Sequence, residues 1–319
     1  MIQSRPVTDR AEWLGWRKRN VNASEVAALF GPKVRPGLTP LKLWALKTGK
    51  IEDDADNPAM RRGRLFEPVV IEILKEDHPD WQINKTLGYY WDDETRLGAT
   101  PDADATRPDI AGEGIIQLKT VGQFAFKKHW HDETGNVAVP SWIAVQASVE
   151  AFLTGATWAG VAALKLGDGG IEIAYIDIPL KMHLIRTIEQ MVADFWQRVA
   201  EDRPYPPDFG LDRNVILDLY DTGWNARLDF SNDAEFRAML LRRDGLKGII
   251  KAGKDATDER KEIDVRIIHR LGNASAAICG KKTVTVRVIK RKGYEVKPTQ
   301  WPMVTVMGNN EEEGVEEDE

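Results

Sequence analysis

Apolar residues recur at helical spacing in three segments of the chain. The segment 60–74 carries an apolar stripe at positions 66, 69, 70, 73 and 74, which is the pattern of an amphipathic helix. The segments 139–152 and 179–202 read in the same way, and the second stops before Pro204. A further short helix is expected at 124–131. These segments predict helices that each bury one face.

Short apolar or alternating runs predict strands between these helices. They lie at 86–91, 97–102, 114–120, 157–166 and 171–178. The last two are joined by Gly167-Asp168-Gly169-Gly170, a sequence typical of a hairpin turn. The resulting order of helices and strands predicts an α/β fold, in which a mixed sheet is flanked by helices.

A change in composition predicts a domain boundary near residue 205, where prolines cluster. We expect a first domain at 1–205, a C-terminal module at 206–309 and an acidic, disordered tail at 310–319. Within the module, the charge-rich segments 233–251 and 256–271 predict a helical hairpin or a short coiled coil. Alternation predicts a strand at 282–291, with which 301–307 is expected to pair. Such a module suits DNA binding, oligomer contacts or partner docking.

The net charge of −6 is dominated by the tail, which holds seven acidic residues and no basic ones. Without it the chain has 44 basic and 43 acidic residues, so local basic clusters can contact phosphates. Cys279 is the only cysteine, which excludes a disulfide framework and a cysteine-based zinc site. Because we find no signal peptide and no long apolar run, we expect a soluble, cytoplasmic protein without a membrane partner.

Candidate chemistry lies in two neighbouring strands. Asp102 ends the run Gly-Ala-Thr-Pro-Asp at 98–102, and Gln117 and Lys119 lie on the next strand, two residues apart and therefore on one face. Metal-dependent phosphodiesterases often use such a pattern. The aspartate binds Mg²⁺, the residue two before the lysine gives a second oxygen, and the ammonium lies beside the attacking water. The alternative is a hairpin with a solvated lysine.

Gln117 departs from this pattern, because the second ligand is normally Asp or Glu. Glutamine offers an oxygen of similar shape without the negative charge, which weakens metal binding. Gln117 is either a natural variant or a deliberate replacement that disarms an enzyme and keeps its shape. Asp104 would share the strand face of Asp102 and could compensate in part, although a solvated acid is the favoured interpretation.

Taken together, several segments resemble the YqaJ/lambda-exonuclease family of phage recombination nucleases, within the PD-(D/E)xK restriction-endonuclease-like fold. The order and spacing match over roughly residues 10–180. The matching segments are Arg17 with 22–26 (Asn-Ala-Ser-Glu-Val), 62–68 (Arg-Gly-Arg-Leu-Phe-Glu-Pro), 98–102 (Gly-Ala-Thr-Pro-Asp), 117–120 (Gln-Leu-Lys-Thr) and 140–146 (Pro-Ser-Trp-Ile-Ala-Val-Gln).

The resemblance implies a role for each matching position. Asp102, Gln117, Glu67 and the main-chain carbonyl of Leu118 would bind two Mg²⁺ or Mn²⁺ ions, and Lys119 would orient the attacking water. Gln146 would be the helical glutamine of the active site. Arg17 and Ser24 would hold the 5′-terminal phosphate, and Arg62 and Arg64 would contact DNA near Glu67.

The implied activity is a Mg²⁺-dependent exonuclease that degrades the 5′-ended strand of linear double-stranded DNA. It would leave 3′ single strands for a phage single-strand annealing protein in a bacterial host cell, and the family often forms a ring-shaped trimer. Two alternatives stay open, namely a structure-specific or non-specific DNA endonuclease and a catalytically silent DNA-binding protein.

Overall fold

The computed structural model describes residues 1–52, 58–167, 170–219, 232–271, 276–279 and 282–285. The chain divides into two compact units, Met1–Thr222 and Gly223–Glu319. The segment 301–307 and the acidic tail, for which the sequence makes predictions, lie outside the described residues.

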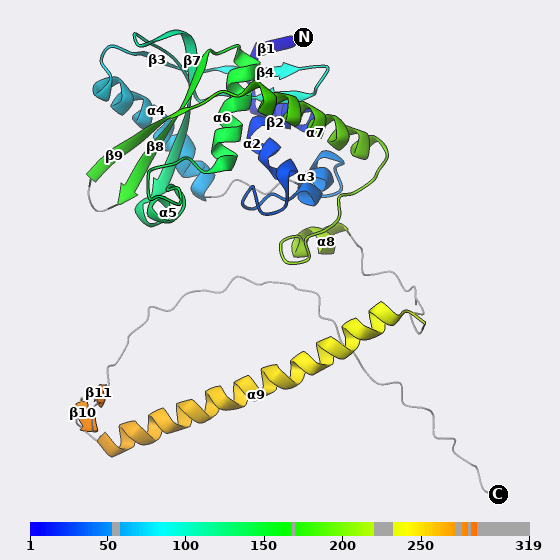
Figure 1. Ribbon diagram of the computed structural model, residues 1–319, viewed down its shortest axis with the longest axis vertical. Helices are drawn as coiled ribbons and strands as arrows, with labels where there is room; N and C mark the ends of the chain where they lie inside the picture. The colour runs from blue at the N-terminus through cyan, green and yellow to red at the C-terminus, as the bar shows by residue number, and fades with distance from the viewer. Residues whose placement is uncertain (53–57, 168–169, 220–231, 272–275, 280–281, 286–319) are drawn as a thin grey trace, which may run out of the picture. The chain divides into compact units, whose positions relative to one another are not determined.

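The first unit contains two sheets (Figure 1). The four-stranded sheet has the order β1-β4-β5-β2 and the five-stranded sheet has the order β3-β6-β7-β8-β9. The strands are β1 (Ile2–Pro6), β2 (Val21–Asn22), β3 (Gln82–Lys85), β4 (Gly88–Asp92), β5 (Leu97–Ala99), β6 (Ala103–Arg107), β7 (Ile110–Gly122), β8 (Trp158–Gly167) and β9 (Gly170–Ile178). The five-stranded sheet is mixed, since β7 and β8 are parallel and its other pairs are antiparallel.

Helices surround these sheets. They are α1 (Arg10–Arg19), α2 (Ala23–Val26), the 3₁₀ helix η1 (Ala27–Phe30), α3 (Pro40–Lys47), α4 (Pro58–Asp77), α5 (Gln123–His129), α6 (Ser141–Thr154), α7 (Met182–Ala200) and α8 (Arg213–Leu219). The predicted α/β class with a mixed sheet and flanking helices is therefore confirmed. Among the described helices, none is both long and apolar enough to cross a bilayer.

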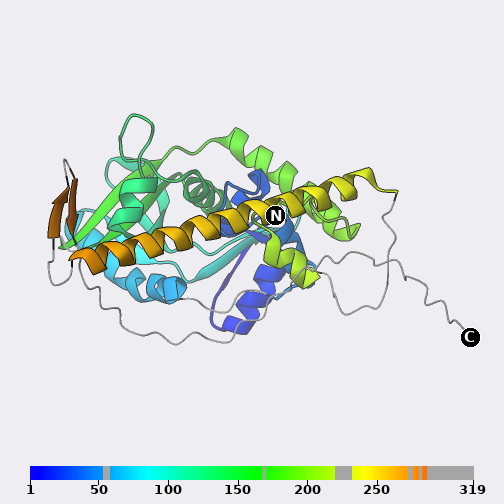
Figure 2. The same ribbon diagram turned by 90° about the horizontal axis from the view of Figure 1, so that it is seen from below.

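Both faces of the five-stranded sheet are covered, as the two views show (Figures 1 and 2). On one face, Val70, Ile71 and Leu74 of α4 pack against Ile116 and Leu118 of β7 and neighbouring residues. On the other, α5 and α6 pack against Ile115 of β7 and the small side chains of β8. Because successive side chains alternate across a strand, Gln117 and Lys119 share the α6 face with Ile115.

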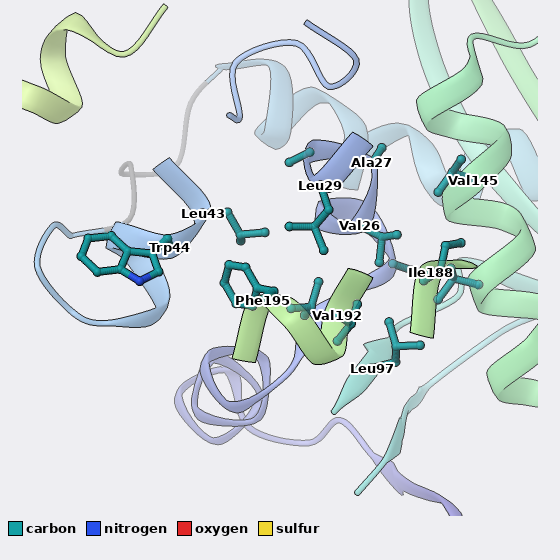
Figure 3. Packing of buried hydrophobic residues seen from close by; sticks show 14 of the residues in the cluster. Val26, Ala27, Leu29, Leu43, Trp44, Leu97, Val145, Ile188, Val192 and Phe195 are labelled. Atoms are coloured by element: carbon teal, nitrogen blue, oxygen red, sulfur yellow. The ribbon is translucent and has the colours of Figure 1, made fainter. Parts of the chain in front are cut away.

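A second core joins the helices to the four-stranded sheet. Figure 3 shows Val192 and Phe195 of α7 directed toward Leu43 of α3 and toward Val26 of α2, all of which are buried. Burial of such side chains stabilises a fold by roughly 1.5–3 kcal/mol each. This core also contains Val145 and Val149 of α6, so α6 packs against the sheet on one side and the helices on the other.

The first unit extends past the boundary that the prolines near 205 predicted. Val215 of α8 is buried in the helical core, and Thr39 donates a short hydrogen bond to Asp212. The prolines form a surface connection within the unit instead of a linker between domains, because the segment after them returns to the same core.

The second unit contains one continuous helix, α9 (Ala234–Leu271), where the sequence predicted two helices that form a hairpin or a short coiled coil. The predicted break at 252–255 contains Gly253 and no proline. One glycine costs a helix only about 1 kcal/mol, which is too little to end it. The strands β10 (Ala276–Cys279) and β11 (Lys282–Thr285) pair antiparallel. The predicted strand at 282–291 is therefore described only in its first half, and its partner is β10.

Candidate active site

Asp102 lies at the junction of the two sheets, directly before β6. The sequence predicted it at the end of one strand over 97–102, but β5 ends at Ala99 and β6 starts at Ala103. The turn Thr100-Pro101-Asp102 links them, because proline has no N–H to donate to a sheet. Ala103 pairs with Ile116 in the antiparallel β6–β7 ladder, which brings Asp102 beside Gln117.

The Asp102 carboxylate accepts two hydrogen bonds from β7. The Leu118 main-chain N–H donates to Oδ2 over 2.8 Å, and the Gln117 side-chain amide donates to the same oxygen through a short contact. The Gln117 amide also donates to the Leu118 carbonyl oxygen over 3.3 Å. The two oxygens predicted to bind metal at 102 and 118 therefore both face the amide nitrogen of Gln117.

Gln146 connects this group to helix α6. Its amide nitrogen donates to Gln117 Oε1 over 2.7 Å, and its own oxygen accepts from Lys119 Nζ over 3.3 Å. Small residues on the facing strand, such as Ala163, allow α6 to approach β7 closely. Asp102, Gln117, Lys119 and Gln146, which are far apart in the sequence, thus form one hydrogen-bonded cluster.

The cluster has a further member that sequence reasoning missed, Glu150. Its Oε1 accepts from Gln146 Nε2 over 2.8 Å, its side chain is buried, and its Oε2 has no hydrogen-bond partner. Glu150 lies one helical turn after Gln146 and so shares its face. The i, i+4 spacing from Gln146, within a helix that is mostly apolar, was the available signal in the sequence.

Burial shifts the pKa values of the ionisable members toward their neutral forms. It raises the pKa of Asp102 to about 6, with the Lys119 charge opposing this and Glu67 adding to it. Burial also raises the pKa of Glu150 to about 8, with a contribution from Asp102. The pKa of Lys119 is lowered by burial, although Asp102 and Glu150 act in the opposite direction. Shifts of this kind are typical of functional sites.

Glu67 lies close enough to contribute to the pKa values of Asp102 and Lys119, but it belongs to α4 and pairs with Lys85 over 3.3 Å. Arg62 and Arg64 are exposed on the same helix, within about two turns of Glu67. Asp104 accepts hydrogen bonds from Asn84 over 3.2 Å and Thr86 over 3.3 Å. These neutral donors come from β3 and the residue that follows it, so Asp104 stays apart from the hydrogen-bonded cluster.

Arg17 and Ser24 lie together, as the resemblance implied, with Arg17 Nη2 3.4 Å from Ser24 Oγ. A half-buried carboxylate, Glu25, organises this region. It pairs with Lys47 over 2.7 Å and with Arg17 over 3.5 Å. Burial alone would raise the pKa of Glu25, but Lys47 and Arg17 outweigh burial and lower it. Arg17 is therefore fixed with its guanidinium near a serine hydroxyl, an arrangement that suits an anion.

Arg35 adds a second cation beside Ser24 that the sequence reasoning did not single out. Its Nε donates to the Ser24 carbonyl over 3.1 Å, and its guanidinium lies 4.5 Å from the centre of the Trp142 ring. Trp142 belongs to α6, the helix that carries Gln146. The region around Ser24 and the polar cluster are therefore connected through the same helix.

The oxygen atoms of the cluster and of Glu67 suit a hard cation such as Mg²⁺, but few of them carry a negative charge. Asp102, Glu67 and the Leu118 carbonyl offer oxygen ligands of the type that Mg²⁺ prefers. Gln117 can offer an oxygen only if its amide turns over, since its nitrogen now faces Asp102. Within the described residues, no group of three or more Asp, Glu, His and Cys side chains is arranged to hold a metal.

Comparisons with known proteins found one family model and several solved structures. Residues 12–157 match the family model described as the YqaJ-like viral recombinase domain. The alkaline exonuclease LHK-Exo from Laribacter hongkongensis is 21% identical, with a TM-score of 0.46 over 65% of this chain and 98% of that one. A phage related exonuclease from Haemophilus somnus 129PT is 14% identical, with a TM-score of 0.45 over 57% and 94%. No curated protein matches the chain.

The family match covers β2, α4, the β6–β7 hairpin and α6, so it includes every member of the polar cluster. It also includes Arg17 and Ser24. The resemblance that the sequence motifs indicated is confirmed to this extent: residues 12–157 match the family model of the YqaJ-like viral recombinase domain.

Proposed function

We propose that this protein is a Mg²⁺-dependent DNA exonuclease that degrades the 5′-ended strand of linear double-stranded DNA and leaves 3′ single strands for recombination. The observation that supports this most directly is the convergence of Asp102, Gln117, Lys119 and Gln146 at the junction of the two sheets. The YqaJ-like recombinase domain over 12–157 supports the substrate class.

Four oxygen donors would hold two Mg²⁺ or Mn²⁺ ions, namely Asp102, Glu67, the Leu118 carbonyl and the Gln117 side-chain oxygen. Bound ions of this type stabilise the charge on the attacking and leaving oxygens of a phosphodiester. Lys119 orients the attacking water, and Gln146 fixes its ammonium by accepting a hydrogen bond over 3.3 Å. Because the pKa of Lys119 is lowered, its ammonium can give up a proton more readily than an exposed lysine.

The direction of degradation rests on the region around Arg17. A terminal 5′-phosphate would accept hydrogen bonds from the Arg17 guanidinium and the Ser24 hydroxyl, which lie 3.4 Å apart. Arg62 and Arg64 would contact the phosphates of the duplex beside Glu67. Wild-type preference for 5′-phosphorylated ends is the expected result of this arrangement.

A second candidate is a catalytically silent DNA-binding protein, and one observation favours it. The Gln117 amide directs its nitrogen, a hydrogen-bond donor, at Asp102 Oδ2 and at the Leu118 carbonyl. A donor in this position competes with a cation for the same two oxygens. In this alternative the domain keeps the shape of the nuclease and its DNA surface but does not cleave.

The decisive experiment compares the wild-type chain with Gln117→Glu on 5′-phosphorylated linear duplex DNA, in Mg²⁺ and in Mn²⁺. We expect Gln117→Glu to cleave at least tenfold faster, since it adds the missing carboxylate. Gln123→Glu, which adds the same charge at an exposed position on α5, is the matched control. If both chains are inactive but folded and DNA-bound, the protein is a silent binder. Cleavage of covalently closed circular DNA would contradict the exonuclease proposal.

The proposal includes a phage single-strand annealing protein as partner, in the cytoplasm of a bacterial host, and a ring-shaped trimer as assembly. We include the annealing protein because an exonuclease that produces 3′ single strands needs a protein that receives them. Sedimentation of the purified chain with and without linear duplex DNA tests the trimeric assembly. A monomer under both conditions would exclude the ring.

A further inference from the structure

A basic pocket of about 340 Å³ lies at the C-terminal end of α1, apart from the polar cluster. Three arginines, Arg5, Arg19 and Arg96, and two tryptophans, Trp16 and Trp91, line it together with Asp93. Three guanidinium groups against one carboxylate leave the pocket positive. Its volume is in the range of small-ligand sites, roughly 300–1,000 Å³.

The four-stranded sheet builds one side of the pocket. In the antiparallel β1–β4 pair, Arg5 lies opposite Tyr89 and Gln3 lies opposite Trp91. These side chains therefore share one face of the sheet, since positions two apart point the same way. Trp16 of α1 covers this face, and its ring centre lies 5.7 Å from Tyr89 and 6.4 Å from Trp91, with planes within 28° and 19° of parallel.

Arg96 is held in place by a backbone conformation that is unusual for its residue type. Its φ is +55°, in the left-handed region, within the turn between β4 and β5. Its guanidinium donates twice to the Arg19 carbonyl, over 3.0 and 2.8 Å, and lies 3.4 Å from the centre of the Trp196 ring. A cation fixed in this way loses little conformational freedom when it meets an anion. Left-handed backbone at a non-glycine residue is often found at functional positions.

We propose that this pocket binds one nucleotide of single-stranded DNA, with the phosphate on Arg5 and Arg19 beside Arg96 and the base against Trp91. Arginines with nearly parallel aromatic rings are how proteins bind single strands without reading their sequence. An acidic peptide would use the arginines but has no flat group for the rings, which is why we favour DNA. The inference depends on the proposed DNA substrate, and the pocket would hold the strand that is not degraded.

Helix α1 gives a physical route from the pocket to the active site. Arg19 and Trp16 face the pocket, whereas Arg17 contacts Ser24 and Trp13 donates to Thr100 over 3.0 Å. Thr100 lies two residues before Asp102. One helix therefore places a candidate end-binding group and a candidate strand-binding group on its different faces.

The test measures binding of a fluorescently labelled single-stranded oligo(dT) by anisotropy, in EDTA so that no cleavage occurs. For Arg5→Ala/Arg19→Ala we expect a loss of affinity of about tenfold and a fall of about 1.4 in the slope of log K against log salt. Arg10→Ala, an exposed arginine on the same helix, is the matched control and should leave both quantities unchanged. A double variant that binds oligo(dT) like Arg10→Ala would overturn the proposal.

A second arm tests the contact with the base. Trp91→Leu should weaken binding of oligo(dT) about fivefold or more and leave binding of an abasic oligonucleotide of equal length unchanged. Equal weakening on both oligonucleotides would contradict the stacking contact. A poly-glutamate peptide is the probe for the other class of ligand: if only its binding falls in the double variant, the pocket takes an acidic peptide and the proposal is wrong. Because these binding measurements need no cleavage, they test the pocket even if the nuclease assay finds no activity.

Discussion

The amide of Gln146 donates to Gln117 Oε1 over 2.7 Å, and this contact turns the nitrogen of Gln117 toward Asp102. The same Gln146 nitrogen also donates to Glu150 over 2.8 Å. One side chain on α6 thus fixes the orientation of the residue that departs from the expected motif. With Gln117 in this orientation, Asp102 has a donor beside it instead of a second carboxylate.

Gln146→Leu should destabilise the protein, because it leaves Gln117 Oε1 and Glu150 Oε1 buried without a donor. An unsatisfied buried acceptor costs about 1–3 kcal/mol, so two of them predict a loss of roughly 2–6 kcal/mol in the free energy of unfolding in urea. Gln123→Leu, at an exposed position, is the control. A loss below that of the control would show that Gln146 is not needed to satisfy these oxygens.

Glu150→Gln should change how stability depends on pH. Burial raises the pKa of Glu150 from 4.5 to about 8, so the wild-type free energy of unfolding falls as pH rises through that interval. The variant lacks this titration. Its stability relative to wild type should therefore increase between pH 5 and pH 8, by up to about 1.4 kcal/mol per pH unit.

Urea unfolding at pH 5, 6.5 and 8 measures this difference for Glu150→Gln. Glu133→Gln is the control variant, since the Glu133 carboxyl lies at the surface and its removal should leave the pH profile of stability unchanged. Parallel pH profiles for wild type and Glu150→Gln would mean that Glu150 does not hold a proton in the folded protein.

Lys119→Ala should abolish cleavage in whichever version of the chain is active, and it should preserve binding of duplex DNA. The ammonium is partly buried and is held by Gln146, so its role is local to the cluster. Lys128→Ala removes an exposed lysine of α5 and should change neither property. Single-turnover cleavage and gel-shift titration give the two measurements, and residual cleavage above a few per cent of the parent would contradict the role of Lys119.

Arg17→Ala should reduce the preference for 5′-phosphorylated ends over 5′-hydroxyl ends. The fold should persist, because Glu25 keeps its pair with Lys47 at 2.7 Å. We expect the ratio of the two initial rates to fall at least fivefold in an active version of the chain, which corresponds to about 1 kcal/mol. An unchanged ratio would remove Arg17 from the proposed phosphate pocket.

The placement of the candidate site followed from the sequence because it depends on short-range geometry. Gln117 and Lys119 are two apart on a strand, and Asp102 precedes the strand that pairs with it, so one hairpin brings the three together. Gln146 could be added only through the family resemblance, since nothing local predicts which strand a helix will cover.

Other features depended on three-dimensional packing and could not be predicted. Glu150 has the residue type of a solvent-exposed helix position, and only the fold shows it to be buried. Strand β1 pairs with β4, over 80 residues later in the chain, and local patterns carry no signal for such a partner. In α9, the segment 252–255 with Gly253 was predicted to separate two helices, but the backbone cost of one glycine did not interrupt the helix.

The position of α6 between β7 and β8 has a consequence for the order in which the domain is made. A nascent chain that ends before Ser141 already contains the hairpin with Asp102, Gln117 and Lys119, but it lacks the helix that orients them and the parallel strand that anchors that helix. The cluster is therefore completed only when α6 and β8 have been synthesised and have folded back across the sheet. Until then the hairpin carries Asp102, Gln117 and Lys119 but lacks Gln146, the side chain of α6 that bonds Gln117 and Lys119 in the folded domain.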